Sequence, residues 1–200
     1  MDDSTVVEIP AFFTNKIAKI ITFNNNGITV ETAGPTVFIS SENISAFRFR
    51  TVWTRGYKFV FGRQYVIETK DFNNKVFQIK LNSIYGIRRK AYYEAWSSIF
   101  KQLWAHYFCN MLNYYVDLYD VGQEFELAGV KFLTDGISWD KKNKLLWKEI
   151  SLKNYRSYFM IHHVDNLLQR KSCSFANDWN AYLLQCLLKT IVNQHKMAKA

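Results

Sequence analysis

The chain has 200 residues, enough for one large domain or two small ones. Apolar residues make up 48% of it, so the chain can bury a core and is not a disordered tail. The net charge of +9 favours anionic partners such as phospholipid head groups, nucleic acid or acidic proteins. No run of about 18 apolar residues occurs, and the acidic N-terminus is unlike a secretory signal. We therefore expect a cytoplasmic protein.

Residues 16–81 have the pattern of short antiparallel strands separated by turns. The runs are rich in Val, Ile, Thr, Phe and Tyr, which favour strands. The expected strands are 16–23, 28–32, 36–40, 44–53, 57–61, 64–71 and 75–81. Between the first two, Gly27 ends an asparagine-rich turn, and we expect it to take a positive φ, as a tight hairpin requires. Ile28 then begins the inward face of the next strand.

An amphipathic helix is predicted from Trp96 onward, after an insertion at residues 82–94. Its large apolar residues recur at spacings of three and four, which is the period of a helix with one wide buried stripe. The stripe consists of Trp96, Ile99, Phe100, Leu103, Trp104, Tyr107 and Phe108.

The second half repeats this order in shorter form. The expected strands lie within 124–133, 137–140, 145–155, 157–165 and 167–175, and Gly136 with Ile137 repeats the glycine–isoleucine turn. A second amphipathic helix starts at Trp179, with Asn177 or Asp178 as its cap. Its stripe matches the first at every position and consists of Trp179, Tyr182, Leu183, Cys186, Leu187, Thr190 and Ile191. This match indicates a duplication, in which Trp96 and Trp179 take equivalent buried positions.

The order of elements resembles the pleckstrin-homology-like (PH-like) fold, in the form of small bacterial PH-like domains. The residues that carry the resemblance are Gly27, Ile28, Val30 and Ile44 in the first half, and Gly136, Ile137, Trp139, Trp147 and Ile150 in the second. The first half departs from the family pattern at Ser41, where a tryptophan is expected. The resemblance implies a mainly β fold with C-terminal helices (α+β). It would consist of two tandem PH-like sandwich or barrel repeats, residues 1–113 and 114–200, each closed by one amphipathic helix.

Basic residues on the strands of the first repeat form the first candidate binding site. They are Arg48, Arg50, Arg55, Lys58 and Arg63. The resemblance implies a phosphate site, because many PH domains bind inositol phosphates through Lys or Arg near their early strands. Arginine suits this role because it forms charge-assisted hydrogen bonds with phosphate oxygens. The solvated outer face of an antiparallel sheet explains the same residues.

A second basic cluster consists of Arg88, Arg89 and Lys90, beside two tyrosines. It could neutralise the phosphates of a nucleic acid or touch an anionic membrane. An exposed loop at the start of the helix is the structural alternative. The loop is the preferred interpretation, although three cations near a helix N-terminus oppose the helix dipole, which is an argument for a functional role.

Residues suited to catalysis or metal binding are scarce. No Gly-x-Ser-x-Gly, Cys-x-x-Cys or glycine-rich phosphate loop occurs. His162 and His163 are neighbours on a predicted strand, so they face opposite sides and cannot easily share a metal ion. The three cysteines are expected to be reduced, buried thiols. We therefore expect no enzymatic activity, no cofactor and no metal.

These features favour a non-enzymatic binding or scaffolding module that recognises a protein or peptide along a strand edge or a sheet–helix groove. The alternative is peripheral binding of anionic lipid head groups through the basic first repeat. Nucleic acid is not expected as a partner, and no pattern in the sequence determines the oligomeric state.

Overall fold

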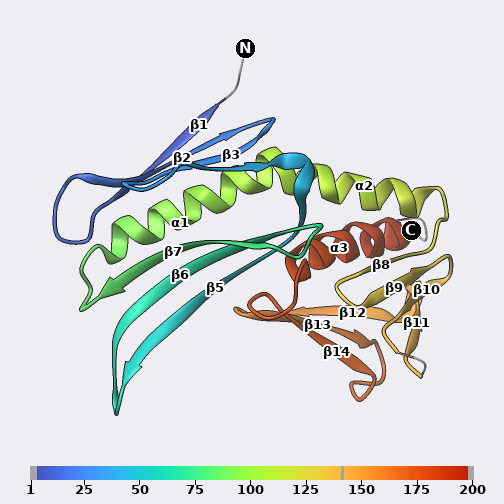
Figure 1. Cartoon of the computed structure of the whole chain (residues 1–200). Helices are drawn as coiled ribbons and strands as arrows, with labels where there is room; N and C mark the ends of the chain where they lie inside the picture. Colours follow the sequence, from blue (N-terminus) through green and yellow to red (C-terminus); the bar gives the residue numbers. More distant parts are fainter. Residues whose placement is uncertain (1–3, 141, 198–200) are drawn as a thin grey trace. The chain divides into compact units, whose positions relative to one another are not determined.

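Figure 1 shows the computed structural model of the protein, which describes residues 4–140 and 142–197. The chain divides into two compact units, Met1–Cys109 and Asn110–Ala200. The described residues form four antiparallel sheets, a 32-residue helix in the middle of the chain and a C-terminal helix. The α+β class expected from the sequence is therefore confirmed. None of the helices in this described part is long and apolar enough to cross a membrane.

Unit 1 contains two antiparallel sheets followed by a helix. The strands of the first sheet, in spatial order, are β1 (Thr5–Pro10), β2 (Ile17–Asn24), β3 (Gly27–Glu31) and β4 (Val37–Ser40). A short 3-10 helix, η1 (Ser41–Asn43), leads into the second sheet. Its strands, in spatial order, are β5 (Ile44–Gly56), β6 (Phe59–Asp71) and β7 (Val76–Ile84). The helix α1 (Arg89–Leu103) packs against β1, β6 and β7.

The core of unit 1 forms where the inward faces of the strands meet the apolar side of the helix. Ile21, Phe23 and Ile28 of the first sheet are completely buried. Phe47 of the second sheet stacks on Phe108, which follows α1, with ring centroids 3.5 Å apart. The strand period of two and the helix period of 3.6 thus direct apolar residues to one interior.

A π-helical segment, η2 (Trp104–Phe108), continues α1 and reaches the first sheet. The Tyr107 hydroxyl lies 2.7 Å from the carbonyl oxygen of Asn24 and 2.6 Å from that of Gly27. Burial raises the pKa of Tyr107 to about 12, so its hydroxyl remains a proton donor near neutral pH. This tyrosine therefore attaches the helix to the β2–β3 turn.

Unit 2 has the same order of elements with shorter strands. The helix α2 (Cys109–Asp120) leads into a sheet whose strands, in spatial order, are β11 (Lys144–Leu146), β10 (Gly136–Ser138), β9 (Val130–Leu133) and β8 (Phe125–Leu127). A 3-10 helix, η3 (Trp147–Glu149), precedes the second sheet. Its strands, in spatial order, are β12 (Ile150–Asn154), β13 (Tyr158–His163) and β14 (Arg170–Ser174). The helix α3 (Ala181–Met197) ends the described chain.

Several strand boundaries differ from the sequence expectation. β1 has no counterpart among the expected strands. The turn expected at residues 54–56 lies instead at Tyr57–Lys58, so β6 combines two expected strands. Thr54 and Arg55 keep pairing with β6 because a β-bulge absorbs an extra residue at that point.

The two repeated glycines are required by close strand approach. A Cβ atom on Gly27 would lie 2.2 Å from the carbonyl oxygen of Ile39, and one on Gly136 would lie 2.0 Å from that of Leu145. Gly136 does not have a positive φ, so the expected turn-based reason is wrong for this residue. The isoleucine after each glycine is completely buried, which confirms that it begins an inward face.

The helices begin elsewhere than the sequence suggests. α1 begins at Arg89, so the expected insertion at 82–94 is the end of β7, a turn and the first turns of the helix. Trp96 and Trp179 are only partly buried, and Trp179 precedes α3. The prediction that these tryptophans take equivalent buried positions is therefore wrong.

The buried side of α3 is shifted by one residue from the predicted stripe. Thr190 is exposed, whereas Leu184 and Leu188 are completely buried. Apolar residues continue beyond one side of the predicted stripe, at Leu184, Leu188 and Val192, whereas Lys189 and Asn193 flank its other side. Leu184 and Leu188 are buried because they are more apolar than the residues on the other flank of the stripe.

Candidate functional site

The hairpin of β5 and β6 extends beyond the rest of its sheet (Figure 1). β7 pairs with β6 only as far as Gly62, which lies opposite Ile84. Residues 55–60 therefore have no third strand beside them in the described structure, whereas the Phe61 carbonyl accepts a hydrogen bond from the Tyr85 amide just beyond β7. We call residues 52–63 the hairpin tip.

The hairpin tip exposes large apolar side chains. Tyr57 is 97% exposed and Phe59 is 62% exposed. Val52, Trp53 and Val60 are also exposed. Solvated sheet faces normally present polar residues to water, whereas contiguous apolar surface marks a contact with a partner or membrane. The tip therefore has the composition of a contact surface.

The same residues carry positive charge without negative charge. Arg55, Lys58 and Arg63 lie within the hairpin tip. No Asp or Glu occurs in residues 43–67, or in residues 72–93, which contain β7 and the start of α1. Cations closer than the Debye length of about 8 Å reinforce one another's potential. The net charge of the hairpin tip is therefore positive.

Tyr57 occupies the hairpin turn in a left-handed backbone conformation, with φ of 42°. A bulky L-residue rarely adopts this conformation, which costs about 1–2 kcal/mol relative to glycine. Its exposed side chain gains little packing in return. Backbone strain of this kind is more frequent at functional sites, which favours a functional role for the Tyr57 ring.

Arg63 is held in position by aromatic rings. Its guanidinium carbon lies 3.9 Å from the ring centre of Trp53 and 6.0 Å from that of Tyr65. With Tyr85 and Arg89 it lines a pocket of about 200 Å³. Its Nε atom is buried and has no hydrogen-bond partner among the described residues. This buried nitrogen is out of reach of a ligand, so the contacts fix the position of Arg63 but do not identify a ligand for it.

Two of the predicted ligand residues are instead paired within the sheet. Arg48 and Arg50 contact the carboxylate of Glu68 at 2.5 and 3.5 Å. The Glu68 side chain is only 5% exposed and also accepts a hydrogen bond from Gln78. This network joins β5, β6 and β7, so these two arginines have a structural role.

The second predicted cluster is divided between roles. Arg88 precedes α1 and donates hydrogen bonds to the Thr14 carbonyl and the Asn15 side chain, each at 2.7 Å. It therefore anchors the β1–β2 loop. The Nζ atom of Lys90 lies 3.9 Å from the Glu94 carboxylate, one turn further along the helix. Of this cluster, Arg89 lines the pocket beside the hairpin tip.

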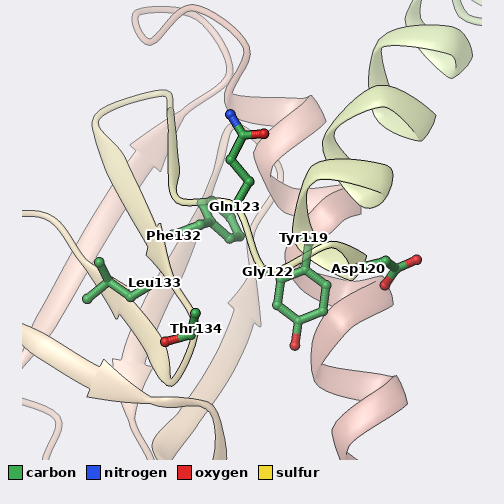
Figure 2. Close-up of a pocket in the computed structure, with 7 residues that line it drawn as sticks. All are labelled: Tyr119, Asp120, Gly122, Gln123, Phe132, Leu133 and Thr134. Atoms are coloured by element: carbon green, nitrogen blue, oxygen red, sulfur yellow. The ribbon is translucent and has the colours of Figure 1, made fainter.

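A further pocket, of about 240 Å³, lies in unit 2 (Figure 2). Its lining comes from the end of α2, the loop after it, β9 and the next turn, and consists of Tyr119, Asp120, Gly122, Gln123, Phe132, Leu133 and Thr134. The Tyr119 hydroxyl lies 2.6 Å from Nε2 of His195, whose ring stacks on Trp147. Burial and the nearby Asp120 raise the pKa of Tyr119, so it stays a neutral phenol. These contacts join α2, α3 and η3, which is a structural role.

The neighbouring histidines at the end of β13 form local hydrogen bonds. His162 Nδ1 lies 2.9 Å from the His163 carbonyl oxygen, and His163 Nδ1 accepts a hydrogen bond from the Asp165 amide. Burial raises the pKa of Cys173 to about 11, so this thiol is protonated at neutral pH. In residues 4–140 and 142–197, no three His, Cys, Asp or Glu side chains are placed to hold a metal ion.

A scan against models of known protein families finds no match to this chain, and a search of curated proteins also finds none. Function must therefore be inferred from the surface. The structure brings the predicted Arg55, Lys58 and Arg63 together at the hairpin tip. Sequence reasoning missed Trp53 and Tyr57 as site residues. The available signal was a dense mixture of aromatic and basic residues without an acid.

Proposed function

We propose that the protein is a non-enzymatic binding module that attaches to anionic membrane surfaces through the hairpin tip. The observation that carries this proposal is the combination of exposed aromatic rings and basic side chains, without an acid, on one protruding hairpin. Tyr and Trp favour the interface between water and hydrocarbon. Each Lys or Arg near an anionic leaflet contributes about 1 kcal/mol. The cytoplasm is the proposed location because cytoplasmic leaflets carry anionic lipids.

We also propose that the two units are tandem PH-like repeats. This is supported by the order that they share: four antiparallel strands, a 3-10 helix, three antiparallel strands and a helix. It is also supported by Gly27 and Gly136, which meet the next strand in the same way. An experimental structure whose units superpose strand for strand would support duplication, and unlike connections would refute it.

A protein or peptide partner, the first expectation from the sequence, is the competing occupant of the hairpin tip. Exposed Trp, Tyr and Arg are also enriched at protein interfaces. However, Val52 and Trp53 are adjacent on β5, so they face opposite sides of the hairpin, and both are exposed. A lipid surface can surround a hairpin tip on both sides, whereas a protein interface usually covers one. The tip therefore favours lipid.

Vesicle sedimentation tests the proposal. The protein should sediment with vesicles of mixed phosphatidylcholine and phosphatidylserine, but not with phosphatidylcholine alone. High salt should release it, because salt screens the attraction. Changing Arg55, Lys58 and Arg63 together to Glu should lower the affinity about 100-fold or more, since each lost attraction contributes about 1 kcal/mol.

A matched control changes three exposed basic residues of unit 2, Lys148, Arg156 and Lys189, to Glu. This variant has the same net charge as the hairpin variant and should bind like the parent. Equal losses in both variants would show that only overall charge matters. A parent protein that does not sediment would overturn the lipid proposal and return the protein partner to first place.

A further inference from the structure

We infer that the free edge of β7, with the pocket beside it, binds an extended peptide of a partner protein in which apolar and acidic side chains alternate. This site is distinct from the hairpin tip and does not depend on membrane attachment. The peptide would join the second sheet of unit 1 as an added strand.

β7 is one of the two edge strands of the second sheet in the described part of unit 1. β1 ends in a register shift at Pro10, β4 has only four residues, and β5 contains two register shifts. β7 runs for nine residues in unbroken register with β6, and no described strand pairs with its other side. Its unpaired N–H and C=O groups can therefore pair with another strand. Exposed edges are usually protected by a bulge, a proline or a short length, and β7 has none of these.

A mostly apolar pocket of about 410 Å³, which we call the edge pocket, opens beside this strand. Its lining comes from β1, β2, the loop between them, β7 and Tyr92 of α1. The Tyr92 hydroxyl lies 3.2 Å from the Pro10 carbonyl oxygen, its acceptor. Phe12 and Phe13 also line the pocket with their rings packed edge to face, and Phe13 is 84% exposed. The edge pocket can therefore accept a large apolar side chain.

The side chains of β7 select the sequence of the peptide. Leu81 faces the interior and is 3% exposed, whereas its neighbours Lys80 and Asn82 are exposed on the other face. Side chains of an added strand lie on the same face as their cross-strand neighbours. A peptide residue beside Leu81 therefore points toward the interior and should be apolar. A residue beside Lys80 points outward and should be acidic.

The charge of the edge pocket supports the same choice. Lys19 and Lys80 both line it, and its described lining contains no acidic residue. The acyl chain of a free fatty acid could fill the apolar space, but it would leave the edge of β7 unpaired. A peptide main chain supplies donors and acceptors at the repeat of the strand. The edge and the pocket together therefore favour a peptide.

Selection from a phage-displayed library of random dodecapeptides tests this site with the full chain as bait. The enriched peptides should alternate apolar and acidic residues. A synthetic copy of an enriched peptide should bind the Ala18→Phe variant at least tenfold more weakly than the parent protein. Ala18 is exposed and lines the edge pocket, so a phenylalanine there would fill the pocket. The matched Ala18→Ser variant should bind like the parent, and so should Tyr57→Gly at the hairpin tip.

Two further measurements separate the main-chain and charge contributions. Methylation of alternate backbone nitrogens on the pairing side of the peptide should abolish binding, because it removes the donors of an added strand. Lys80→Glu should weaken the acidic peptide tenfold or more, and a peptide with Lys in place of Glu should restore binding. The inference is overturned if no peptide is enriched over the Ala18→Phe bait. It is also overturned if the methylated peptides bind equally well, or if a fluorescent fatty acid binds where no peptide does.

Discussion

Replacing Tyr57 by glycine should stabilise the fold while weakening membrane binding. Tyr57 has φ of 42° in the hairpin turn. This conformation costs a non-glycine residue about 1–2 kcal/mol, and the added freedom of glycine in the unfolded chain costs about 0.5–1 kcal/mol. Because the side chain is 97% exposed, its removal loses little packing. The free energy of unfolding should therefore rise by about 0.5–1 kcal/mol.

Membrane affinity should change in the opposite direction. A tyrosine side chain can bury about 150–250 Å² of surface, and apolar area contributes about 25 cal/mol per Å². If about half of the Tyr57 ring enters the interfacial region, it contributes about 2 kcal/mol. Its loss should then lower the affinity for anionic vesicles about 30-fold.

Thermal melts followed by circular dichroism measure the first effect, and vesicle sedimentation measures the second. Asn74→Gly is the matched control, because Asn74 has φ of 64° in the β6–β7 turn at the opposite end of β6. This control should sediment like the parent. A Tyr57→Gly variant with parental vesicle binding would refute the role of the ring. One that melts at a lower temperature would refute the strain.

Three further predictions concern the folded core. Gly136→Ala should lower the free energy of unfolding by about 1–3 kcal/mol in denaturant titrations, because the new methyl group meets the Leu145 carbonyl oxygen. Phe108→Ala should cost about 3–5 kcal/mol in the same assay, since its ring is completely buried against Phe47. Cys173 should resist thiol reagents in the native protein, and its contribution to stability should fall as the pH rises from 9.0 towards about 11, where the unfolded thiol ionises first. Rapid labelling of native Cys173 would contradict this.

The class of the fold could be predicted because strand alternation and helix period are local properties. Ile28 and Ile137 illustrate this, since each follows a glycine at the start of a strand and is completely buried. Strand lengths could not be predicted in the same way. The continuation of β5 through Arg55 depends on a bulge that lets the partner strand accommodate an extra residue. The register of such a pair depends on both strands together, so the sequence of one strand alone does not predict it.

The exposure of the aromatic rings at the candidate site also depends on contacts between elements that are distant in the sequence. Tyr65 and Trp53 lie on the same face of the β5–β6 hairpin, yet Tyr65 is 1% exposed and Trp53 is 46% exposed. Tyr65 is covered because Tyr93 and Trp96 of α1 pack against it. Two residues further toward the turn, Trp53 has Arg63 over its ring instead. An aromatic residue on this face thus belongs to the core or stays exposed according to whether the first turns of α1 reach it.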